Sequence, residues 1–188
     1  MFESTRLFYR KLDETDYNLF FMLYSDKEVM KFAYLDRFES HADAIEAFKN
    51  ILHDQEDKSK GTQFVVISKE TKNAIGIVDY YVIMNHDFGG IFEIGYFMLP
   101  QYWGQGFGTE MGSAIIDYLF KNYNFHKVTA SCNSNNRSSE NIMIKLGMTK
   151  EGLFRKVRYK RGTWDDEIRY GLLKDEWNSE YEALLCST

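Results

Sequence analysis

The sequence predicts a single α+β domain in which helices pack against a mixed, mostly antiparallel sheet. Three observations lead to this prediction. Apolar runs typical of strands fill the middle of the chain and recur near its C-terminal end. Apolar residues at helical spacing occupy the segments between them. No linker composition divides the 188 residues, which are enough chain for one substantial core, so we expect one domain over residues 1–188.

The N-terminal third is expected to hold one strand followed by helices. A strand is predicted over 6–12, and the acidic cluster at 13–16 suits a helix start because carboxylates accept hydrogen bonds from unpaired first-turn amides. A serine followed three residues later by an acidic residue repeats this start signal at 25–28 and 40–43. Apolar residues at helical spacing over 44–52 then predict a helix with one face on the sheet.

The periodicity changes in the middle of the chain, where strands are expected at 64–67, 75–82 and 91–99. Pro100 lacks the amide hydrogen that a sheet ladder needs, so it ends the third strand. The remaining predicted elements are a helix over 104–123, a strand over 127–132, a helix over 136–146 capped by Gly147, a hairpin over 153–173 that turns at 161–163, and a short helix around 175–177.

Composition narrows the class of protein. The net charge of −5 argues against nonspecific nucleic-acid binding, so no direct nucleic-acid partner is expected. No apolar run approaches the length of a membrane span and charges interrupt the N-terminus, which predicts a cytoplasmic protein without a membrane partner. Cys132 and Cys186 are expected to be free thiols. The four histidines show no ligand spacing, so no metal site is expected.

A segment with three glycines lies between the strand at 91–99 and the helix that follows. Residues 101–110 read QYWGQGFGTE. Glycines there let the backbone approach a ligand closely, and a helix N-terminus adds unpaired amides, which together favour an anion such as phosphate. Turn geometry at a strand-to-helix junction explains the same glycines, so this segment alone leaves both interpretations open. It lacks the Gly-Lys-Ser/Thr ending of a P-loop, and its strand does not begin a dinucleotide-binding unit.

The wider sequence resembles a known family. Several motifs in order are similar to the signature of the GNAT superfamily of N-acetyltransferases, and more narrowly to its ribosomal-protein N-terminal acetyltransferase branch. The resemblance implies a GNAT fold with a splayed pair of strands and flanking helices, acetyl-CoA as cosubstrate and an amine as acceptor. The similar segments, which span nearly the whole chain, are 5–7, 25–29, 93–100, 102–110, 136–139, 145–148, 151–152 and the neighbourhood of Trp164 and Asp166.

The resemblance also assigns coenzyme-binding residues. The family pattern Gln/Arg-x-x-Gly-x-Gly/Ala falls on 103–108 with Trp103 at the first position, and we expect pyrophosphate binding to survive because main-chain amides make the contacts. Met98 and Leu99 would lie where the central strand splays and offer backbone groups to the pantetheine arm and the thioester. Asn136 matches a position that contacts the pantetheine arm. The residues implied are Met98, Leu99, Trp103, Gly104, Gln105, Gly106, Phe107, Gly108, Thr109 and Asn136.

Two side chains are candidates for the chemical step. Glu93 matches a position where several superfamily members carry a catalytic glutamate, which would take the amine proton directly or through water. The alternative is a glutamate on the solvent-facing side of a half-buried strand. The family's frequent tyrosine acid falls on Met143, which cannot donate a proton. Ser139 is the candidate to contact the leaving sulfur, although a first-turn helix serine also bonds its own backbone.

The acceptor remains open. The branch suggests a protein N-terminus, such as that of a ribosomal protein. The alternatives are a small-molecule amine (a polyamine, antibiotic or amino acid) and a catalytically silent coenzyme A-binding module, which the absence of a tyrosine at Met143 keeps open. A homodimer is also left open. The basic cluster at 155–161 could attract an acidic substrate, RNA or the coenzyme's ribose phosphate, but we favour a solvated hairpin whose charge discourages edge pairing.

Overall fold

The chain folds around one eight-stranded sheet. The computed structural model describes residues 1–57 and 59–177. The strands run in the order β1-β2-β3-β4-β5-β6-β8-β7, and every neighbouring pair is antiparallel except β5 and β6. This arrangement confirms the predicted α+β class and the mixed, mostly antiparallel sheet. The strands are β1 Phe2–Glu3, β2 Leu7–Lys11, β3 Gly61–Ser68, β4 Ala74–Met84, β5 Gly90–Met98, β6 Phe125–Asn133, β7 Thr149–Lys160 and β8 Thr163–Leu173.

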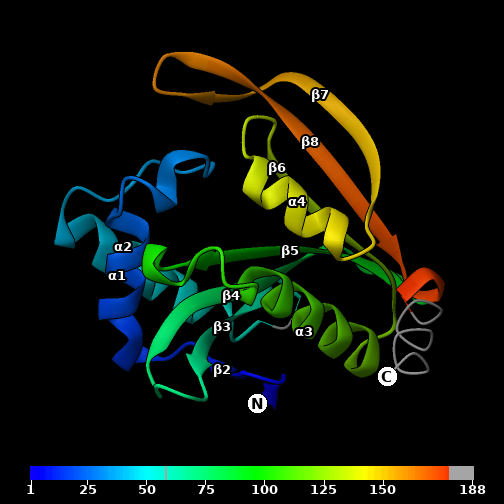
Figure 1. The fold of residues 1–188 in the computed structure, drawn as a ribbon, viewed down its shortest axis with the longest axis horizontal. Coiled ribbons are helices and arrows are strands. Elements are labelled where there is room, and N and C mark those ends of the chain that lie inside the picture. Colours follow the sequence, from blue (N-terminus) through cyan, green and yellow to red (C-terminus); the bar gives the residue numbers. More distant parts are fainter. Residues whose placement is uncertain (58, 178–188) are drawn as a thin grey trace.

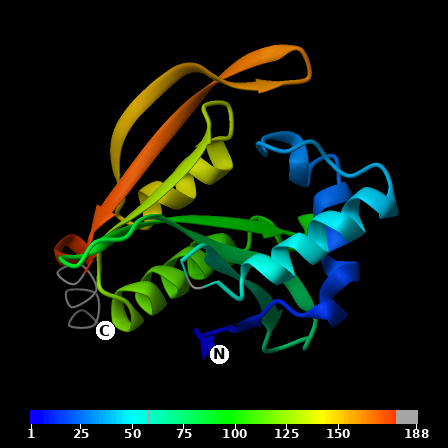
Figure 2. The same cartoon turned by 180° about the vertical axis from the view of Figure 1, so that it is seen from behind.

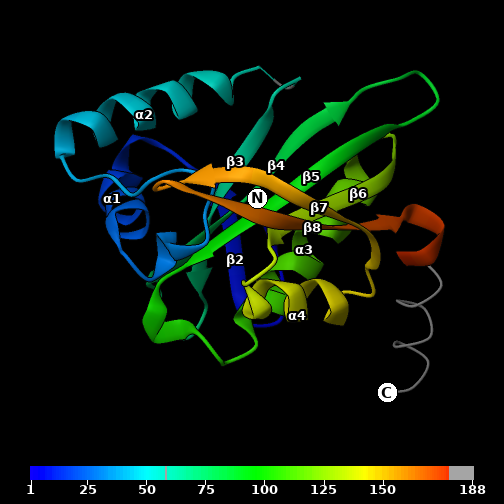
Figure 3. The same ribbon diagram turned by 90° about the horizontal axis from the view of Figure 1, so that it is seen from above.

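Helices lie on both faces of the sheet. As Figure 3 shows, α1 (Tyr17–Ser25) and α2 (His41–Asp54) lie on one side, and α3 (Phe107–Asn122) and α4 (Arg137–Lys145) lie on the other. The β7–β8 hairpin rises above the rest of the sheet (Figure 1). Seen from behind, its tip faces the segment between α1 and α2 (Figure 2). Short 3-10 turns occupy Glu14–Asp16, Val29–Lys31 and Pro100–Tyr102.

Each face of the sheet has its own apolar core, because side chains alternate along a strand. On β5, Phe92 and Ile94 join the core beneath α3 and α4. Phe97 packs with the core beneath α1 and α2. Glu93 is four residues before Phe97 on the same strand, so its side chain also points to the α1–α2 face. This alternation decides which side of the sheet each site residue can reach.

Most predicted elements are present, with shifts of a few residues at their ends. Ser40 is the N-cap of α2, as its start signal predicts. The helix start predicted at Ser25 is wrong, because α1 ends at that residue. Asp26 instead caps the next turn by accepting from the amides of Glu28 and Val29. Strand β1 was not predicted. The last described residues, 174–177, are helical.

One of the two cysteines lies among the described residues. Cys132 is free and buried, and Cys186 lies outside the described residues. Within the described part of the chain, no helix is long and apolar enough to cross a membrane. No group of three His, Cys, Asp or Glu side chains in the same part gathers to hold a metal ion.

Candidate active site

The site begins where β5 and β6 part. The two strands pair only from Gly90 to Glu93 on β5 and from Phe125 to Thr129 on β6. Beyond that point β6 stays paired with β8, and β5 stays paired with β4. The sheet therefore opens into a V beyond Glu93, which is the splayed pair of strands that the sequence predicts.

Backbone groups of every second β5 residue face this opening. The Leu99 amide donates to the Ile75 carbonyl at 2.9 Å, and hydrogen-bonding residues alternate along an antiparallel pair. The groups that point away from β4 therefore belong to Ile94, Tyr96 and Met98. The Met98 carbonyl accepts from the Trp103 indole at 2.8 Å. Of the two residues predicted to offer backbone groups to the coenzyme, Met98 keeps its amide on the open side, whereas the Leu99 amide belongs to the sheet.

The glycine segment places a helix N-terminus beside the V. Gly104 and Gly106 have φ angles of 73° and 80°, a left-handed conformation that costs other residues about 1–2 kcal/mol. Gly106 is the N-cap of α3, and among the described residues no side chain caps its first amides. These amides are a suitable site for an anion. Gly108 also allows close packing, because a Cβ there would lie 2.6 Å from Cδ1 of Ile142 on α4.

A cation to which the sequence analysis gave no role lies at the same helix start. Arg6 donates through Nε to Glu110 at 2.7 Å and through Nη1 to the Gln105 carbonyl at 3.0 Å. Its guanidinium lies 4.1 Å from the centroid of the Phe107 ring. Burial acts to raise the pKa of Glu110, but the bonds from Arg6 and Ser4 lower it overall. Arg6 thus fixes the glycine segment against the start of the chain.

Helix α4 and strand β5 together form a pair of hydroxyl groups beside the V. Asn136 is its N-cap and accepts from the Ser139 amide at 3.2 Å. The Ser139 hydroxyl lies 3.0 Å from the Tyr96 hydroxyl of β5. Burial raises the pKa of Tyr96, and the bond to Ser139 opposes that rise. Met143 is completely buried in the core, so no hydroxyl occupies the family's tyrosine position.

Glu93 lies in a polar cluster on the opposite face. Its carboxylate accepts from the Ser131 hydroxyl of β6 at 2.6 Å, and the Tyr34 hydroxyl is 3.3 Å from the same serine oxygen. Arg158 of β7 lies 3.2 Å from the Tyr34 ring centroid and donates to the buried Glu167 at 2.9 Å. Burial lowers the pKa of Arg158 to about 10. Glu93 is therefore half-buried and hydrogen-bonded. Of its neighbours, Arg158 belongs to the basic cluster at 155–161, and Ser131 was not singled out in the sequence.

The β7–β8 hairpin is held against the segment between α1 and α2. Lys160 donates to the carbonyls of Met30, Ala33 and Leu35 at 2.9, 2.9 and 2.6 Å. The interpretation of the basic cluster as a solvated hairpin is therefore wrong for Lys160 and for the buried Arg158. Lys160 is needed there because helix-end and turn carbonyls require donors, and Arg158 pairs with the buried Glu167.

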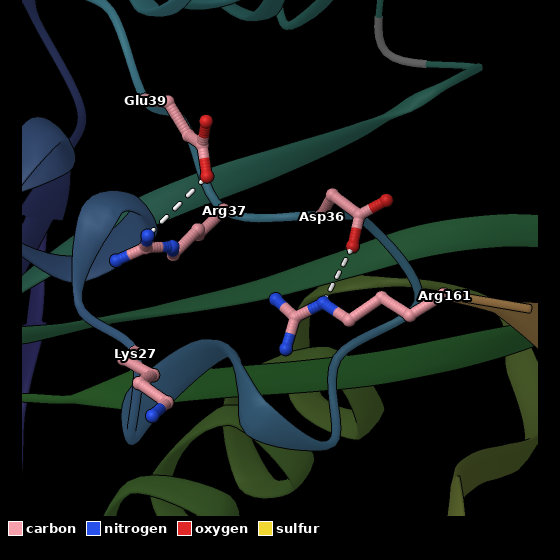
Figure 4. A pocket seen from close by; sticks show the side chains of 5 residues that line it. All are labelled: Lys27, Asp36, Arg37, Glu39 and Arg161. Carbon is pink, nitrogen blue, oxygen red and sulfur yellow. Dashed lines mark hydrogen bonds and ion pairs between the residues drawn. The ribbon is translucent and has the colours of Figure 1, made fainter.

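A hollow of about 470 Å³ lies between the same two segments. Figure 4 shows its lining: Arg161 from the hairpin binds Asp36 at 3.2 Å, Arg37 and Glu39 form a second pair at 3.3 Å, and Lys27 stands apart from both. Three cations and two anions line this groove. Tyr34, which reaches Ser131 beside Glu93, belongs to the same segment.

The arrangement suits a transferase that joins an extended, anion-bearing donor to a nucleophile. The α3 amides can hold the anion, the open β5 edge can hold an extended chain by main-chain hydrogen bonds, and Glu93 faces the other side of the sheet.

Comparisons with known proteins then give the family. The chain belongs to the GNAT acetyltransferases, because residues 6–149 match the family model described as "Acetyltransferase (GNAT) domain". An uncharacterized N-acetyltransferase, YnaD, of Bacillus subtilis strain 168 is 34% identical over 178 residues, which cover 93% of this chain and 98% of that protein. The resemblance drawn from the sequence motifs is confirmed.

Solved structures agree on the fold. The ribosomal-protein-S5-alanine acetyltransferase of Vibrio fischeri superposes with a TM-score of 0.77 at 25% identity, covering 94% of this chain and 97% of that one. The spermidine N-acetyltransferase of Vibrio cholerae, solved in complex with CoA and spermine, gives a TM-score of 0.80 at 22% identity, covering 92% and 98%. Relatives of this chain thus include enzymes named for different acceptors.

Proposed function

We propose that this protein acts in the cytoplasm and transfers the acetyl group of acetyl-CoA to the α-amine of a protein N-terminus, such as that of a ribosomal protein. The family membership gives the reaction class. The observation that favours a polypeptide acceptor is the groove between the β7–β8 hairpin and the segment between α1 and α2.

The donor side follows from the V and the glycine segment. The main-chain amides of 103–109 would hold the pyrophosphate of the coenzyme at the α3 N-terminus. The pantetheine arm would run along the open β5 edge between Met98 and Asn136, where main-chain groups can pair with its amides. Arg6 would keep the glycine segment in place.

The charges that line the groove bear on the kind of acceptor that it can bind. A polyamine carries several positive charges and suits a site lined by carboxylates. The groove has three cationic side chains and two anionic ones, and both anions are already paired. A polypeptide with mixed side chains fits such a lining better than a compact polycation does. Its N-terminal amine would enter toward Glu93, past Tyr34.

The chemical step would use groups from both faces. Glu93 would take a proton from the amine, the amine nitrogen would attack the thioester carbonyl, and the Met98 amide would stabilise the oxyanion. An alkyl thiol has a pKa of about 8.5, so the thiolate leaves with little help. The Tyr96–Ser139 hydroxyl pair would contact the sulfur in place of the family tyrosine, which supports an active enzyme over a silent coenzyme-binding module.

An acceptor screen tests the proposal. Purified protein is incubated with acetyl-CoA and peptides, polyamines or aminoglycosides, and products are detected by mass shift. We expect a gain of one acetyl group on the α-amine of peptides and none on the same peptides with a blocked N-terminus and a free lysine. Acetylation of spermidine alone would favour the small-amine alternative, which the spermidine acetyltransferase relative represents. Coenzyme binding without turnover on any acceptor would support the silent module.

Arg161 provides a matched variant for the groove. Arg161→Glu reverses a charge in the lining, and we expect a raised KM for the peptide with unchanged coenzyme affinity. Arg155→Glu makes the same change on the same hairpin outside the groove and serves as the control. Equal effects of the two variants would refute the assignment of the groove to the acceptor.

A further inference from the structure

A buried carboxyl group lies near Glu93 without a role in the step just described. Asp79 of β4 is 3% exposed, and its Oδ1 has no hydrogen-bond partner among the described residues. A buried carboxylate oxygen without a hydrogen-bond partner is unfavourable. Such a group in a folded protein calls for a physical explanation.

Gly95 allows the Asp79 carboxyl to reach toward β5. The two residues are opposite each other in the β4–β5 register, and a Cβ added at position 95 would overlap Asp79 Oδ1. Glu93 is two residues earlier on the same strand, so it shares a face with the Asp79 side chain. Diagonal neighbours across an antiparallel pair are about 7 Å apart. Two carboxyl groups therefore stand together at the point where β5 leaves β6.

The neighbours on this face favour a proton on Asp79. Gln63 is the register partner of Asp79 on β3, and its Oε1 is also buried without a partner in the described chain. A protonated Asp79 could donate to the Gln63 oxygen, which would give both buried oxygens a partner. Burial, with a further contribution from Glu93, raises the pKa of Asp79 to about 7, although the Gly95 amide and the Tyr81 hydroxyl lower it.

The other charged or titratable groups facing the pair are few. Tyr81 is opposite Glu93 on β4, and Asp79 raises its pKa far above neutrality. Burial raises the pKa of Tyr24 of α1, beside Gln63, well above its ordinary value. Arg158 of β7 interacts with Glu93 and stays protonated, because its pKa is about 10. Among these groups, Asp79 is the one whose pKa lies near 7.

We propose that Asp79 and Glu93 form one proton-accepting unit, in which Asp79 is a positioning residue that makes Glu93 a stronger base toward the acceptor amine. The proposal rests on the proposed role of Glu93. It adds a second residue that the sequence motifs do not contain.

The proton balance is complete without another reactant. The acceptor ammonium gives one proton to the doubly ionised pair and becomes a neutral amine. Its nitrogen forms the C–N bond, the C–S bond breaks, and the thiolate takes the second nitrogen proton to give the coenzyme thiol. The pair then returns its proton to solvent. An ordinary carboxyl with a pKa of about 4.3 is a weak base toward an α-amine of about 8. The pKa of Asp79, at about 7, lies much closer to that of the amine.

The first test is the pH dependence of turnover in wild type, Asp79→Asn and Glu93→Gln. In wild type we expect turnover to fall as the pH is lowered through about 7, the pKa of Asp79, and we call this fall the acidic limb. In Asp79→Asn we expect the limb to move down by at least one pH unit, with turnover at pH 7.5 reduced roughly tenfold. In Glu93→Gln we expect this limb to be replaced by one at higher pH, which is set by deprotonation of the acceptor amine. Asp54→Asn, an exposed carboxylate paired with Lys60 at the end of α2, is the control and should match wild type.

The second test does not depend on the acceptor. Aspartate labelled with carbon-13 is titrated by NMR in the free enzyme, and the Asp79 signal is assigned by its loss in Asp79→Asn. We expect a midpoint near 7 that falls in Glu93→Gln. Two results would overturn the coupling while leaving the proposed role of Glu93 intact. One is an Asp79 midpoint that does not change in Glu93→Gln. The other is an acidic limb that does not move in Asp79→Asn while Glu93→Gln loses turnover. Full activity of Glu93→Gln with an unchanged pH profile would instead overturn the proposed role of Glu93.

Discussion

Replacing Asp79 with asparagine is expected to make the protein more resistant to unfolding at high pH. The pKa of Asp79 is raised from 3.8 to about 7 in the folded state, chiefly by burial. Between pH 5 and 7 the folded carboxyl keeps its proton while the unfolded one has lost it, so stability falls as pH rises through this window. Each pH unit corresponds to about 1.4 kcal/mol, or about 3 kcal/mol over the window. Asparagine does not titrate, so the stability of Asp79→Asn does not fall with pH in this way.

The measurement is urea unfolding of wild type and Asp79→Asn at pH 5, 6, 7 and 8. The free energy of unfolding of the variant minus that of wild type is expected to rise by up to about 3 kcal/mol from pH 5 to 7 and to level off above. Comparing differences across pH removes any constant effect of asparagine on packing. Asp54→Asn is expected to give a flat difference. A flat or falling difference for Asp79→Asn would refute the assignment of a raised pKa to this carboxyl.

Four further changes test the site. Glu93→Gln is expected to lower turnover, raise the pH optimum and spare coenzyme binding, as measured by pH–rate profiles and calorimetry. Gly106→Val is expected to abolish coenzyme binding because it places a β-branched side chain at a φ of 80°. Gly162→Val, at a φ of 81° in the hairpin turn, should be similarly strained yet still bind the coenzyme; equal loss of binding would count against a local role for Gly106. Lys160→Met is expected to raise the KM for a peptide acceptor, since three carbonyls lose their donor, and faster hydrogen exchange over 30–35 would show the released segment. Glu167→Gln leaves Arg158 with a buried unpaired charge, and we expect a loss of about 3 kcal/mol in urea unfolding; a loss below 1 kcal/mol would contradict burial of the pair.

The sequence predicted the local structure of the glycine segment better than the surroundings of Glu93. The glycine segment lies at a helix N-terminus, and Met98 has its amide on the open edge, as the motifs implied. These features are local, because a few consecutive residues fix the turn and the strand end. Arg6 and Asp79 were missed since their partners lie far away in sequence. A carboxylate within the apolar strand 75–82 was a signal that could have drawn attention to Asp79.

The sequence by itself determined the fold class, the order of most elements and the family, because these depend on periodicity and on motifs of adjacent residues. Only the tertiary structure decided what surrounds Glu93. Ser131, Arg158 and Asp79 come from three different strands and Tyr34 from the segment between α1 and α2, and they meet through sheet register and the folding of the hairpin onto that segment. Pairing between distant strands is set by burial of the whole sheet, which no short stretch of sequence records.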